Sequence, residues 1–151
     1  MRTRSLHSPF GDLTLVEDEE AIVALQWRWA ARQDPSPLLD AAIAQLEGYI
    51  ARQRETFDLP FRVGGTAFQQ QVCAVMSAIP FGHTRTYGEI AKEIGVPAQA
   101  VGQACGGNPI PILIPCHRVL GAKGLTGFSG RGGVETKVAL LRHEGAAGLL
   151  I

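Results

Sequence analysis

A cysteine and a histidine stand side by side at Cys116 and His117, and Arg118 follows them. A thiol attacks an electrophile as the thiolate, and a neighbouring basic or cationic group lowers its pKa from a free value of about 8.5. Adjacent side chains rarely hydrogen-bond each other directly, so we expect His117 to take the Cys116 proton through one water molecule. The pattern indicates nucleophilic chemistry at Cys116, although a single Cys-His dipeptide can also be incidental.

A catalytic base needs a third group that orients it, and Glu144 is the candidate. It stands at the C-terminal end of the last expected helix, where the helix dipole disfavours a carboxylate by a few tenths to about 1 kcal/mol. Either a partner compensates this cost or the carboxylate is solvated at a frayed helix end, and both interpretations stay open. Cys116 and His117 lack chelating spacing and have no second Cys or His pair nearby, so we expect no metal site.

The composition is that of a globular protein of one domain or two small ones. The chain has 151 residues, of which 46% are hydrophobic and 19% charged, with no net charge. Residues 1–64 hold 7 basic and 10 acidic side chains, and residues 65–151 hold 7 and 4, so any basic face lies on the second part. Three unpaired cysteines, with no signal peptide and no apolar run of about 18 residues, predict a cytoplasmic protein that does not enter a membrane.

The first part of the chain predicts a small sheet and one helix. Residues 13–16 and 21–25 are short apolar runs separated by turn residues, and an antiparallel meander is the simplest arrangement for them. Residues 37 to about 54 carry apolar side chains at helical spacing. Residues 57–65 break both patterns, and we place the domain boundary there, giving an N-terminal domain of residues 1–62 and a C-terminal domain of residues 63–151.

The second part predicts four helices. Thr66 with Gln69, and Thr86 with Glu89, have the spacing of capping boxes that begin helices over residues 66–79 and 87–94. A second short helix over residues 98–105 follows a tight turn that contains Gly95, which makes the two helices a helix-turn-helix candidate, although such pairs also occur in ordinary bundles. The last helix, over residues 134–144, is expected to turn three side chains inward: Val134, Val138 and Leu141.

The segments around Cys116 have unusual composition. The helix over residues 98–105 has no Lys or Arg to bond guanine in a major groove, but its small residues would let its backbone come close to a partner. Pro109, Pro111 and Pro115 forbid an ordinary helix before Cys116 and predict a stiff, extended backbone there. Cys116 is therefore expected to be held rigidly.

The run Asn108-Pro-Ile-Pro-Ile-Leu-Ile-Pro-Cys116-His117-Arg118-Val119 resembles the active-site signature of the O6-alkylguanine-DNA alkyltransferases, the methylated-DNA:protein-cysteine methyltransferases. The resemblance extends from about Gly65 to Gly145, and the N-terminal residues resemble the family only in layout. It implies an α+β fold, with a small antiparallel sheet and a helix followed by a mainly helical, winged helix-turn-helix-like C-terminal domain.

The resemblance implies DNA repair by an irreversible, single-turnover transfer of an alkyl group from O6 of guanine, or O4 of thymine, to the protein's own cysteine without a cofactor. The partner would be alkylated double-stranded DNA, bound by a monomer in the minor groove with the guanine flipped out, because a thiolate cannot reach an alkyl group inside the duplex. Cys116 would be the nucleophile, His117 the base and Glu144 the carboxylate that orients it.

Other residues receive roles from the same resemblance. Asn108 would brace the cysteine loop, and Tyr87 would donate toward guanine N3 while crowding the 3′ phosphate. The carbonyls of Cys116 and Val119 would read the exocyclic amine, and the Ser129 backbone N–H would meet O6. The remaining substrate or DNA contacts are expected from five residues: Thr86, Ala100, Gly102, Arg118 and Phe128.

One position departs from the family pattern. An arginine that fills the space of the flipped nucleotide usually stands just before the Ala100-Val101-Gly102 stretch, and this chain has Gln99 there. Glutamine is shorter and lacks both the charge and the stacking plane of a guanidinium. Two alternatives therefore stand beside duplex repair. One is transfer from single-stranded DNA, a nucleotide or a small-molecule donor, and the other is a sensor that binds damage without transfer.

Overall fold

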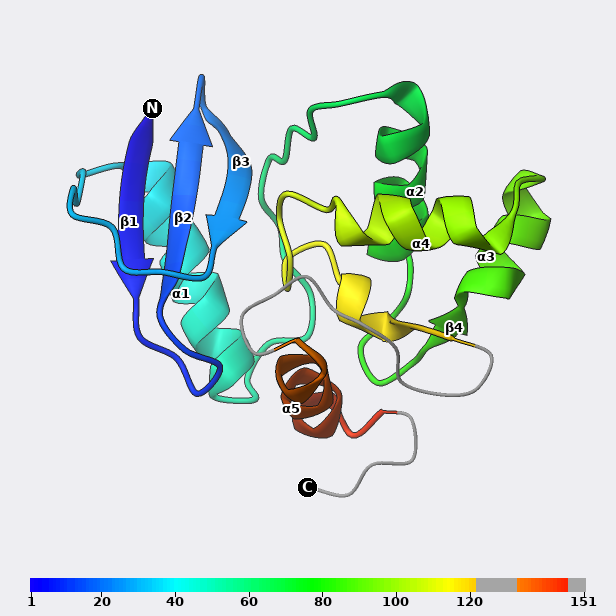
Figure 1. Ribbon diagram of the computed structural model, residues 1–151. Coiled ribbons are helices and arrows are strands. Elements are labelled where there is room, and N and C mark those ends of the chain that lie inside the picture. The colour runs from blue at the N-terminus through cyan, green and yellow to red at the C-terminus, as the bar shows by residue number, and fades with distance from the viewer. Residues whose placement is uncertain (122–132, 147–151) are drawn as a thin grey trace. The chain divides into compact units, whose positions relative to one another are not determined.

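The computed structural model describes residues 1–121 and 133–146, and it divides the chain into two compact units, Met1–Val63 and Gly64–Ile151. The first unit is the expected antiparallel sheet with one helix, and the second is mainly helical (Figure 1). The α+β fold class predicted from the sequence is therefore confirmed. Within the described residues, no helix is long and apolar enough to cross a membrane.

The first unit is a three-stranded meander with a helix packed on it. Its strands pair in the order β1-β2-β3, each antiparallel to the next. The elements are β1 (Arg2–Leu6), β2 (Leu13–Asp18), β3 (Ala21–Gln26) and α1 (Pro37–Ile50). The buried side of α1 carries Leu39, Ala42, Leu46 and Tyr49, at the helical spacing seen in the sequence, and the helix ends a few residues earlier than expected.

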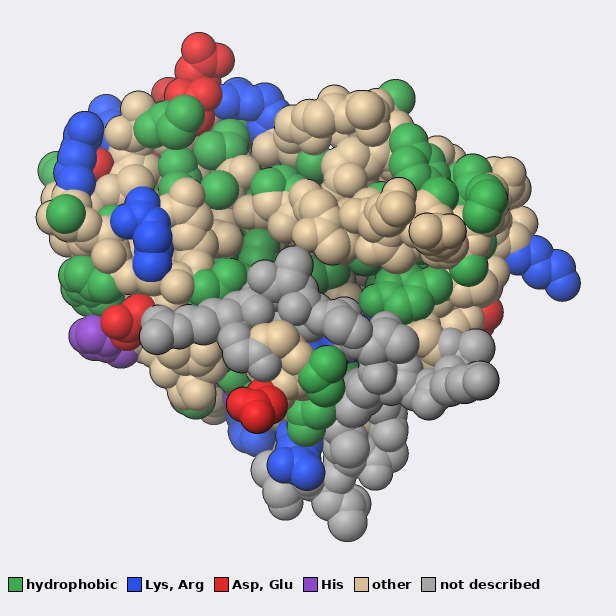
Figure 2. Space-filling model, viewed as in Figure 1, with side chains coloured by type: hydrophobic (Ala, Val, Ile, Leu, Met, Phe, Trp, Pro, Cys, Tyr) green, Lys and Arg blue, Asp and Glu red, His purple; other side chains and the backbone are tan. Residues whose placement is uncertain are grey.

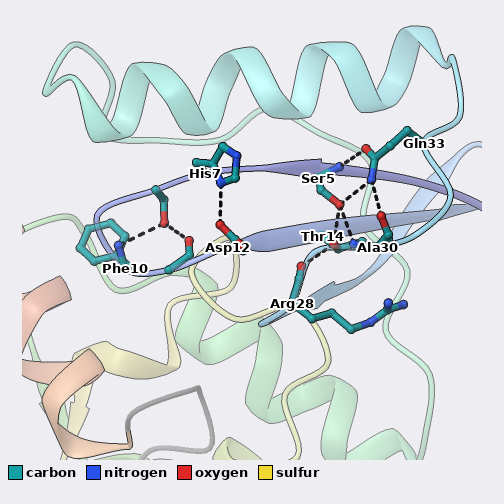
Figure 3. A network of polar contacts seen from close by, with 10 residues as sticks. Ser5, His7, Phe10, Asp12, Thr14, Arg28, Ala30 and Gln33 are labelled. Carbon is teal, nitrogen blue, oxygen red and sulfur yellow. Dashed lines mark hydrogen bonds and ion pairs between the residues drawn. The ribbon is translucent and has the colours of Figure 1, made fainter.

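A polar network ties the segment between β3 and α1 to the sheet (Figure 3). Ser5 and Thr14 are cross-strand partners whose hydroxyl oxygens lie 2.7 Å apart. The Thr14 hydroxyl donates to the Arg28 carbonyl at 2.6 Å, and the Gln33 amide donates to both Ser5 Oγ and the Ala30 carbonyl. These bonds satisfy buried hydroxyls with backbone partners, so the network stabilises the fold of this unit.

The second unit contains four α-helices among its described residues, joined by short connections. Its elements are α2 (Ala67–Ser77), β4 (Arg85–Thr86), α3 (Tyr87–Ile94), α4 (Ala98–Gly106), the 3₁₀ turn η1 (Cys116–Arg118), β5 (Val119–Leu120) and α5 (Val134–Glu144). The short strands β4 and β5 pair in parallel, which the sequence did not predict. This pairing places the start of α3 beside Val119 and Leu120, which follow the turn that contains Cys116.

Of the two predicted capping boxes, the one at Thr86 forms completely and the one at Thr66 forms only in part. At Thr86 both bonds form: its hydroxyl accepts from the Glu89 N–H and its own N–H donates to the Glu89 carboxylate, each at 3.0 Å. At Thr66 only the hydroxyl bond to the Gln69 N–H forms. The Gln69 side chain instead donates to the Ala104 carbonyl at 2.7 Å, so the second half of that predicted box is wrong. The amide joins α2 to α4, a contact that local spacing cannot reveal.

The helix pair α3 and α4 has the expected tight turn. Gly95 ends α3 in the left-handed conformation, with φ of 85°, and the two helices pack on each other. Most of α4 is small and uncharged, and uncharged or hydrophobic side chains cover α2 and α4 on the face drawn in Figure 2. The second helix of the pair, α4, therefore presents mostly small, uncharged side chains, whereas α3 carries exposed charged residues of both signs.

The inward face of α5 differs from the predicted one. Val134 is 41% exposed and Val138 is partly exposed, whereas Leu141 is buried as expected. The stripe that faces the core is Lys137, Leu140, Leu141 and Glu144. This stripe has the i, i+3, i+4, i+7 spacing of a helix face, but two of its members are charged residues that a hydrophobicity pattern assigns to solvent.

Candidate active site

A closed loop positions Cys116, and Asn108 holds it together. The buried Asn108 amide donates to the Ile114 carbonyl at 2.8 Å, and its oxygen accepts from the Ile110 N–H at 3.0 Å. The Ile114 N–H also donates to the Ile110 carbonyl at 2.8 Å. One side chain therefore satisfies the backbone on both sides of the loop, as the bracing role implied by the family resemblance requires.

The backbone of this loop is not extended throughout, so that expectation is wrong at one residue. Ile112 has φ of 70° and is almost wholly buried. A β-branched residue is strained in the left-handed region, and such strain persists only where the surrounding structure enforces it. The hydrogen bonds across the loop and the flanking prolines provide that constraint. The loop is thus closed by internal hydrogen bonds and turns sharply at Ile112.

Cys116 opens the turn η1 and is 4% exposed. Burial raises the pKa of its thiol to about 11, although the Asn108 side chain and the positive charge of Lys137 both act to lower it. The thiol is therefore protonated at neutral pH. A nucleophilic role requires a base that removes the proton as the reaction proceeds.

His117 and Glu144 form a buried pair. His117 Nε2 lies 2.7 Å from Glu144 Oε2, and both side chains are fully buried. Burial acts to raise the pKa of Glu144, but the hydrogen bonds and charges of His117 and Arg118 together hold it well below its ordinary value. The carboxylate is therefore ionised and can only accept, so His117 Nε2 carries the proton of this hydrogen bond.

The other imidazole nitrogen has the chemistry of a base. Burial lowers the pKa of His117 from its ordinary value of 6.5, against the raising effect of Glu144, so the ring is neutral near pH 7. Its Nδ1 atom is then a lone-pair acceptor, and it has no hydrogen-bond partner among the residues that the structure describes. A buried acceptor without a partner fits the predicted water between His117 and Cys116.

Arg118 was expected at the substrate or DNA, but its guanidinium is buried. It binds both oxygens of Glu144, at 2.8 and 2.9 Å, and donates to the Ile79 carbonyl at 2.7 Å. Its guanidinium carbon also lies 5.9 Å from the centre of the Phe81 ring. The side chain thus holds the carboxylate that orients His117, and it links the end of α5 to the chain just after α2.

Sequence reasoning missed Lys137 on α5. The side chain is fully buried, and its ammonium donates to the Val119 carbonyl at 2.6 Å and lies 5.6 Å from the centre of the Tyr87 ring. A signal was present, because the position shares a helix face with Leu140, Leu141 and Glu144. The hydrophobicity pattern alone gave no reason to expect that a lysine at this position is buried.

The remaining predicted residues fall into three groups. Val119 and Tyr87 join the cluster through Lys137, and Thr86 caps the helix that Tyr87 begins. Gln99 is exposed on α4, where Ala100 and Gly102 are partly exposed, and the described structure shows no hydrogen bond or ring contact between these three residues and the Cys116 cluster. Ser129 and Phe128 lie outside the described residues. Within residues 1–121 and 133–146, no group of three or more His, Cys, Asp or Glu side chains could hold a metal ion.

Comparison with known proteins gives the class of both units. Residues 67–146 match the family model of the 6-O-methylguanine DNA methyltransferase DNA-binding domain, and residues 1–63 match the ribonuclease-like domain of the same proteins. The buried thiol site therefore lies within a domain whose relatives bind DNA. The chain belongs to the 6-O-methylguanine DNA methyltransferase family.

Individual relatives are similar in sequence to this chain over nearly its whole length. A methylated-DNA-protein-cysteine methyltransferase of Mycobacterium tuberculosis is 43% identical over 152 residues, covering 93% of this chain and 90% of that protein. The constitutive enzyme of the same name from Bacillus subtilis is 38% identical, covering 91% of each. The crystal structure of the M. tuberculosis protein OGT in complex with DNA superposes with a TM-score of 0.85 at 42% identity, covering 96% of this chain and 93% of that one.

Proposed function

We propose that this chain repairs alkylated DNA by moving the alkyl group from O6 of guanine to its own Cys116. The observation that carries the proposal is the arrangement at His117, the residue after Cys116: a neutral, buried imidazole is held by Glu144 on one nitrogen, and the other nitrogen has no hydrogen-bond partner among the described residues. This arrangement suits the removal of one proton from a thiol whose pKa is too high for spontaneous ionisation. The names of the relatives support the same activity.

The transfer is a single displacement. A water molecule carries the Cys116 proton to His117 Nδ1, and the sulfur attacks the alkyl carbon. The S–C bond forms as the C–O6 bond breaks, and its electron pair leaves with the guanine. Tyr87, at the first turn of α3, supplies a proton toward N3 of the departing base, in the role implied by the family resemblance. No step calls for a cofactor, and the thioether product is stable, so each molecule reacts once.

The helix pair α3 and α4 is the proposed DNA-binding element. Its second helix has no charged residue, and small side chains at Ala100 and Gly102 would allow close approach of the backbone to a narrow groove. We propose binding in the minor groove by a monomer, with the alkylated guanine flipped out of the stack toward Cys116. Recognition through backbone and groove shape suits a repair protein, because damage occurs in any sequence.

The direct test is the mass of the intact protein after incubation with a duplex oligonucleotide that contains one O6-methylguanine. We expect the protein to gain one methyl group and peptide mapping to place it on Cys116. The control is the same duplex without the methyl group, which should leave the mass of the protein unchanged. No gain in mass by folded, reduced protein, or a methyl group on another residue, would contradict the proposal.

Two cysteine variants separate the nucleophile from the other buried thiols. Cys116→Ala should abolish methyl transfer while DNA binding persists. Cys73→Ala, which removes another buried cysteine of the same unit, should still be methylated. Tight binding of damaged DNA by wild type and Cys116→Ala alike, with no gain in mass and no repair by either protein, would indicate a damage sensor instead.

A second candidate function follows from Gln99. The residue is exposed on an uncharged helix, where the family usually has an arginine that takes the place of the flipped nucleotide. A protein that flips bases poorly would prefer single-stranded DNA, a nucleotide or a small-molecule donor, since these need no unstacking. Comparing transfer rates on duplex, single strand and free O6-methylguanine distinguishes the two, and a rate on duplex at least equal to that on single strand would exclude the alternative.

A further inference from the structure

The Gln69 side chain holds the C-terminal end of α4 on α2. Its amide nitrogen donates to the Ala104 carbonyl at 2.7 Å and lies 3.6 Å from Cys73 Sγ. Its amide oxygen lies on the side of Gly107 where a Cβ atom would stand, 3.3 Å from that position. The nitrogen and the oxygen of one amide therefore meet the last turn of α4 and the glycine that follows it, where α4 packs on α2 (Figure 1).

This contact between the two helices is directional. The backbone at Gln69 is fixed in the first turn of α2, because its N–H donates to the hydroxyl of the N-cap residue Thr66 at 3.1 Å. The Ala104 carbonyl that receives the amide also accepts from the Gly107 N–H at 3.2 Å. Burial of apolar surface is non-directional, whereas this hydrogen bond fixes one helix against the other at a defined point.

The end of α4 that Gln69 holds leads directly into the cysteine loop. One glycine follows the helix, and Asn108 comes next. The Asn108 N–H donates to the Cys105 carbonyl at 3.2 Å, and its side chain braces the loop before Cys116. Gln99 is exposed near the other end of the same helix. The helix α4 thus connects the surface proposed for DNA binding with the loop that carries the reacting sulfur.

The other end of α2 supports the proposed base. Arg118 donates to the Ile79 carbonyl, just after α2, at 2.7 Å. The same guanidinium binds the Glu144 carboxylate that orients His117. One helix therefore holds α4 at its first turn, through Gln69, and the His117 system beyond its last turn.

We propose that Gln69 is a positioning residue for alkyl transfer from DNA: its amide sets the place of α4 relative to Cys116. The proposal rests on the proposed function, because it concerns the delivery of a base in DNA to the thiol. Gln69 acts through α4 rather than on the reacting atoms. Its effect comes from distance, since a misplacement of about 1 Å can slow a reaction about a hundredfold.

This role predicts an effect that depends on the source of the alkyl group. A methylated base in a duplex has to be brought to Cys116 by the helix that binds the DNA, whereas iodoacetamide reaches the thiol without DNA. A weaker hold on α4 should therefore slow methyl transfer from duplex and leave iodoacetamide labelling unchanged. A contact that only stabilises the fold would lower the melting temperature and leave both rates of the folded protein in place.

The experiment uses two substitutions of Gln69 and one matched control. Gln69→Met keeps the length of the side chain but has no donor for the Ala104 carbonyl, and Gln69→Glu presents a carboxylate that only accepts at neutral pH. Gln71→Met removes an amide from an exposed position of the same helix. For each folded protein, well below its melting temperature, we measure the single-turnover methyl-transfer rate over a range of O6-methylguanine duplex concentrations. Iodoacetamide labelling of Cys116 is followed by peptide mass spectrometry.

We expect the limiting transfer rate at saturating duplex to fall about tenfold in both Gln69 variants, with the labelling rate of Cys116 unchanged. Gln71→Met should match wild type in both measurements. A wild-type limiting rate in the folded Gln69 variants, a loss of DNA affinity alone, or an equal loss of transfer and labelling would overturn the proposal. A wild-type protein that does not methylate itself would contradict the proposed function and this proposal with it, whereas normal transfer by Gln69→Met would contradict this proposal alone.

A second test adds a methyl group beside the amide. Gly107 has φ of −90° and ψ of 6°, a conformation open to alanine, and the other neighbours of an added Cβ are carbonyl oxygens at 3.6 and 3.7 Å. Gly107→Ala therefore acts mainly by displacing the Gln69 oxygen. We expect it to slow transfer from duplex in the wild-type background and to add nothing in Gln69→Ala, which lacks that oxygen. The same fold change in both backgrounds, or none in either, would overturn the proposal. Gly107→Ala alone, by the same two measurements, decides the question if the Gln69 variants fail to fold.

Discussion

His117 Nε2 lies 2.7 Å from Glu144 Oε2 although the two residues are 27 positions apart in the chain. The same carboxylate accepts two hydrogen bonds from Arg118, so one buried anion serves both residues that follow Cys116. A carboxylate at the C-terminal end of a helix is disfavoured by the dipole, and here two partners compensate that cost. Of the two interpretations that the sequence left open for Glu144, the structure selects the paired one.

Replacing Glu144 by glutamine should impair transfer more than binding. The amide has a donor as well as an acceptor, so it no longer fixes the proton on His117 Nε2, and Arg118 loses its ion pair. We expect methyl transfer at least about a hundredfold slower, and a loss of stability of about 3–5 kcal/mol from breaking a buried pair. Single-turnover rates well below the melting temperature and urea unfolding measure the two effects separately.

Glu135→Gln is the matched control, because it makes the same chemical change at an exposed site in the first turn of α5. It should leave both quantities within the error of the wild-type values. A Glu144→Gln protein that transfers methyl groups at the wild-type rate would show that His117 needs no carboxylate to orient it.

Stability should fall on mild acidification because His117 is buried in its neutral form. Its pKa is lowered from the ordinary value of 6.5, so the unfolded chain binds a proton at a pH where the folded protein does not. The stabilisation is present above about pH 6.5 and is lost as the pH falls toward the folded pKa. Glu144, whose pKa is also lowered, adds its own loss only below the ordinary carboxyl value of 4.5.

Urea midpoints at pH 7.5, 6.5, 5.5 and 5.0 measure this effect. We expect a steady decline in wild type and a flatter profile in His117→Gln, which has no imidazole to protonate at this position. His83, which is exposed, remains in both proteins. Parallel profiles would mean that His117 does not contribute to the acid sensitivity.

How much of the fold and of the candidate site the sequence could predict depends on how far apart in the chain the interacting residues lie. The Thr86 capping box, the Gly95 turn and the buried face of α1 are local patterns, and all three were recovered. Lys137 and Gln69 were misjudged because their side chains serve partners on other helices or strands. The left-handed Ile112 could not be foreseen either, since its conformation is imposed by hydrogen bonds across the loop rather than by its own preference.

Two Asn108 variants should separate the effect of Asn108 on the stability of the loop from its effect on the pKa of the Cys116 thiol. Asn108→Ala leaves the Ile114 carbonyl and the Ile110 N–H without their buried partner, and each unsatisfied group costs about 1–3 kcal/mol. Asn108→Asp keeps the acceptor for Ile110 but places a negative charge beside Cys116, which raises the thiol pKa further. We expect both variants to lower the melting temperature and to shift the pH dependence of Cys116 labelling upward, because both remove the amide that lowers the Cys116 pKa, and the shift should be larger for aspartate.

Gln103→Ala, on the exposed side of α4, controls for loss of an amide side chain near the loop. Melting curves and iodoacetamide labelling over pH give both readouts. A labelling profile that neither variant shifts would show that Asn108 holds the loop without a direct effect on the thiol.

Gln99→Arg should accelerate repair of duplex DNA more than repair of single strands. A guanidinium can occupy the space left by a flipped nucleotide and stack there, which a glutamine amide does less well. A gain of about tenfold on duplex corresponds to about 1.4 kcal/mol of the barrier. Gln103→Arg adds the same charge at another exposed position one turn along α4, so it reports the general attraction of a cation to phosphate. The measurement is the single-turnover rate of each variant on duplex and on single-stranded DNA. Both rates should rise together in Gln103→Arg, whereas Gln99→Arg should raise the rate on duplex more. The same ratio of duplex rate to single-strand rate in both variants would show that residue 99 does not enter the base stack.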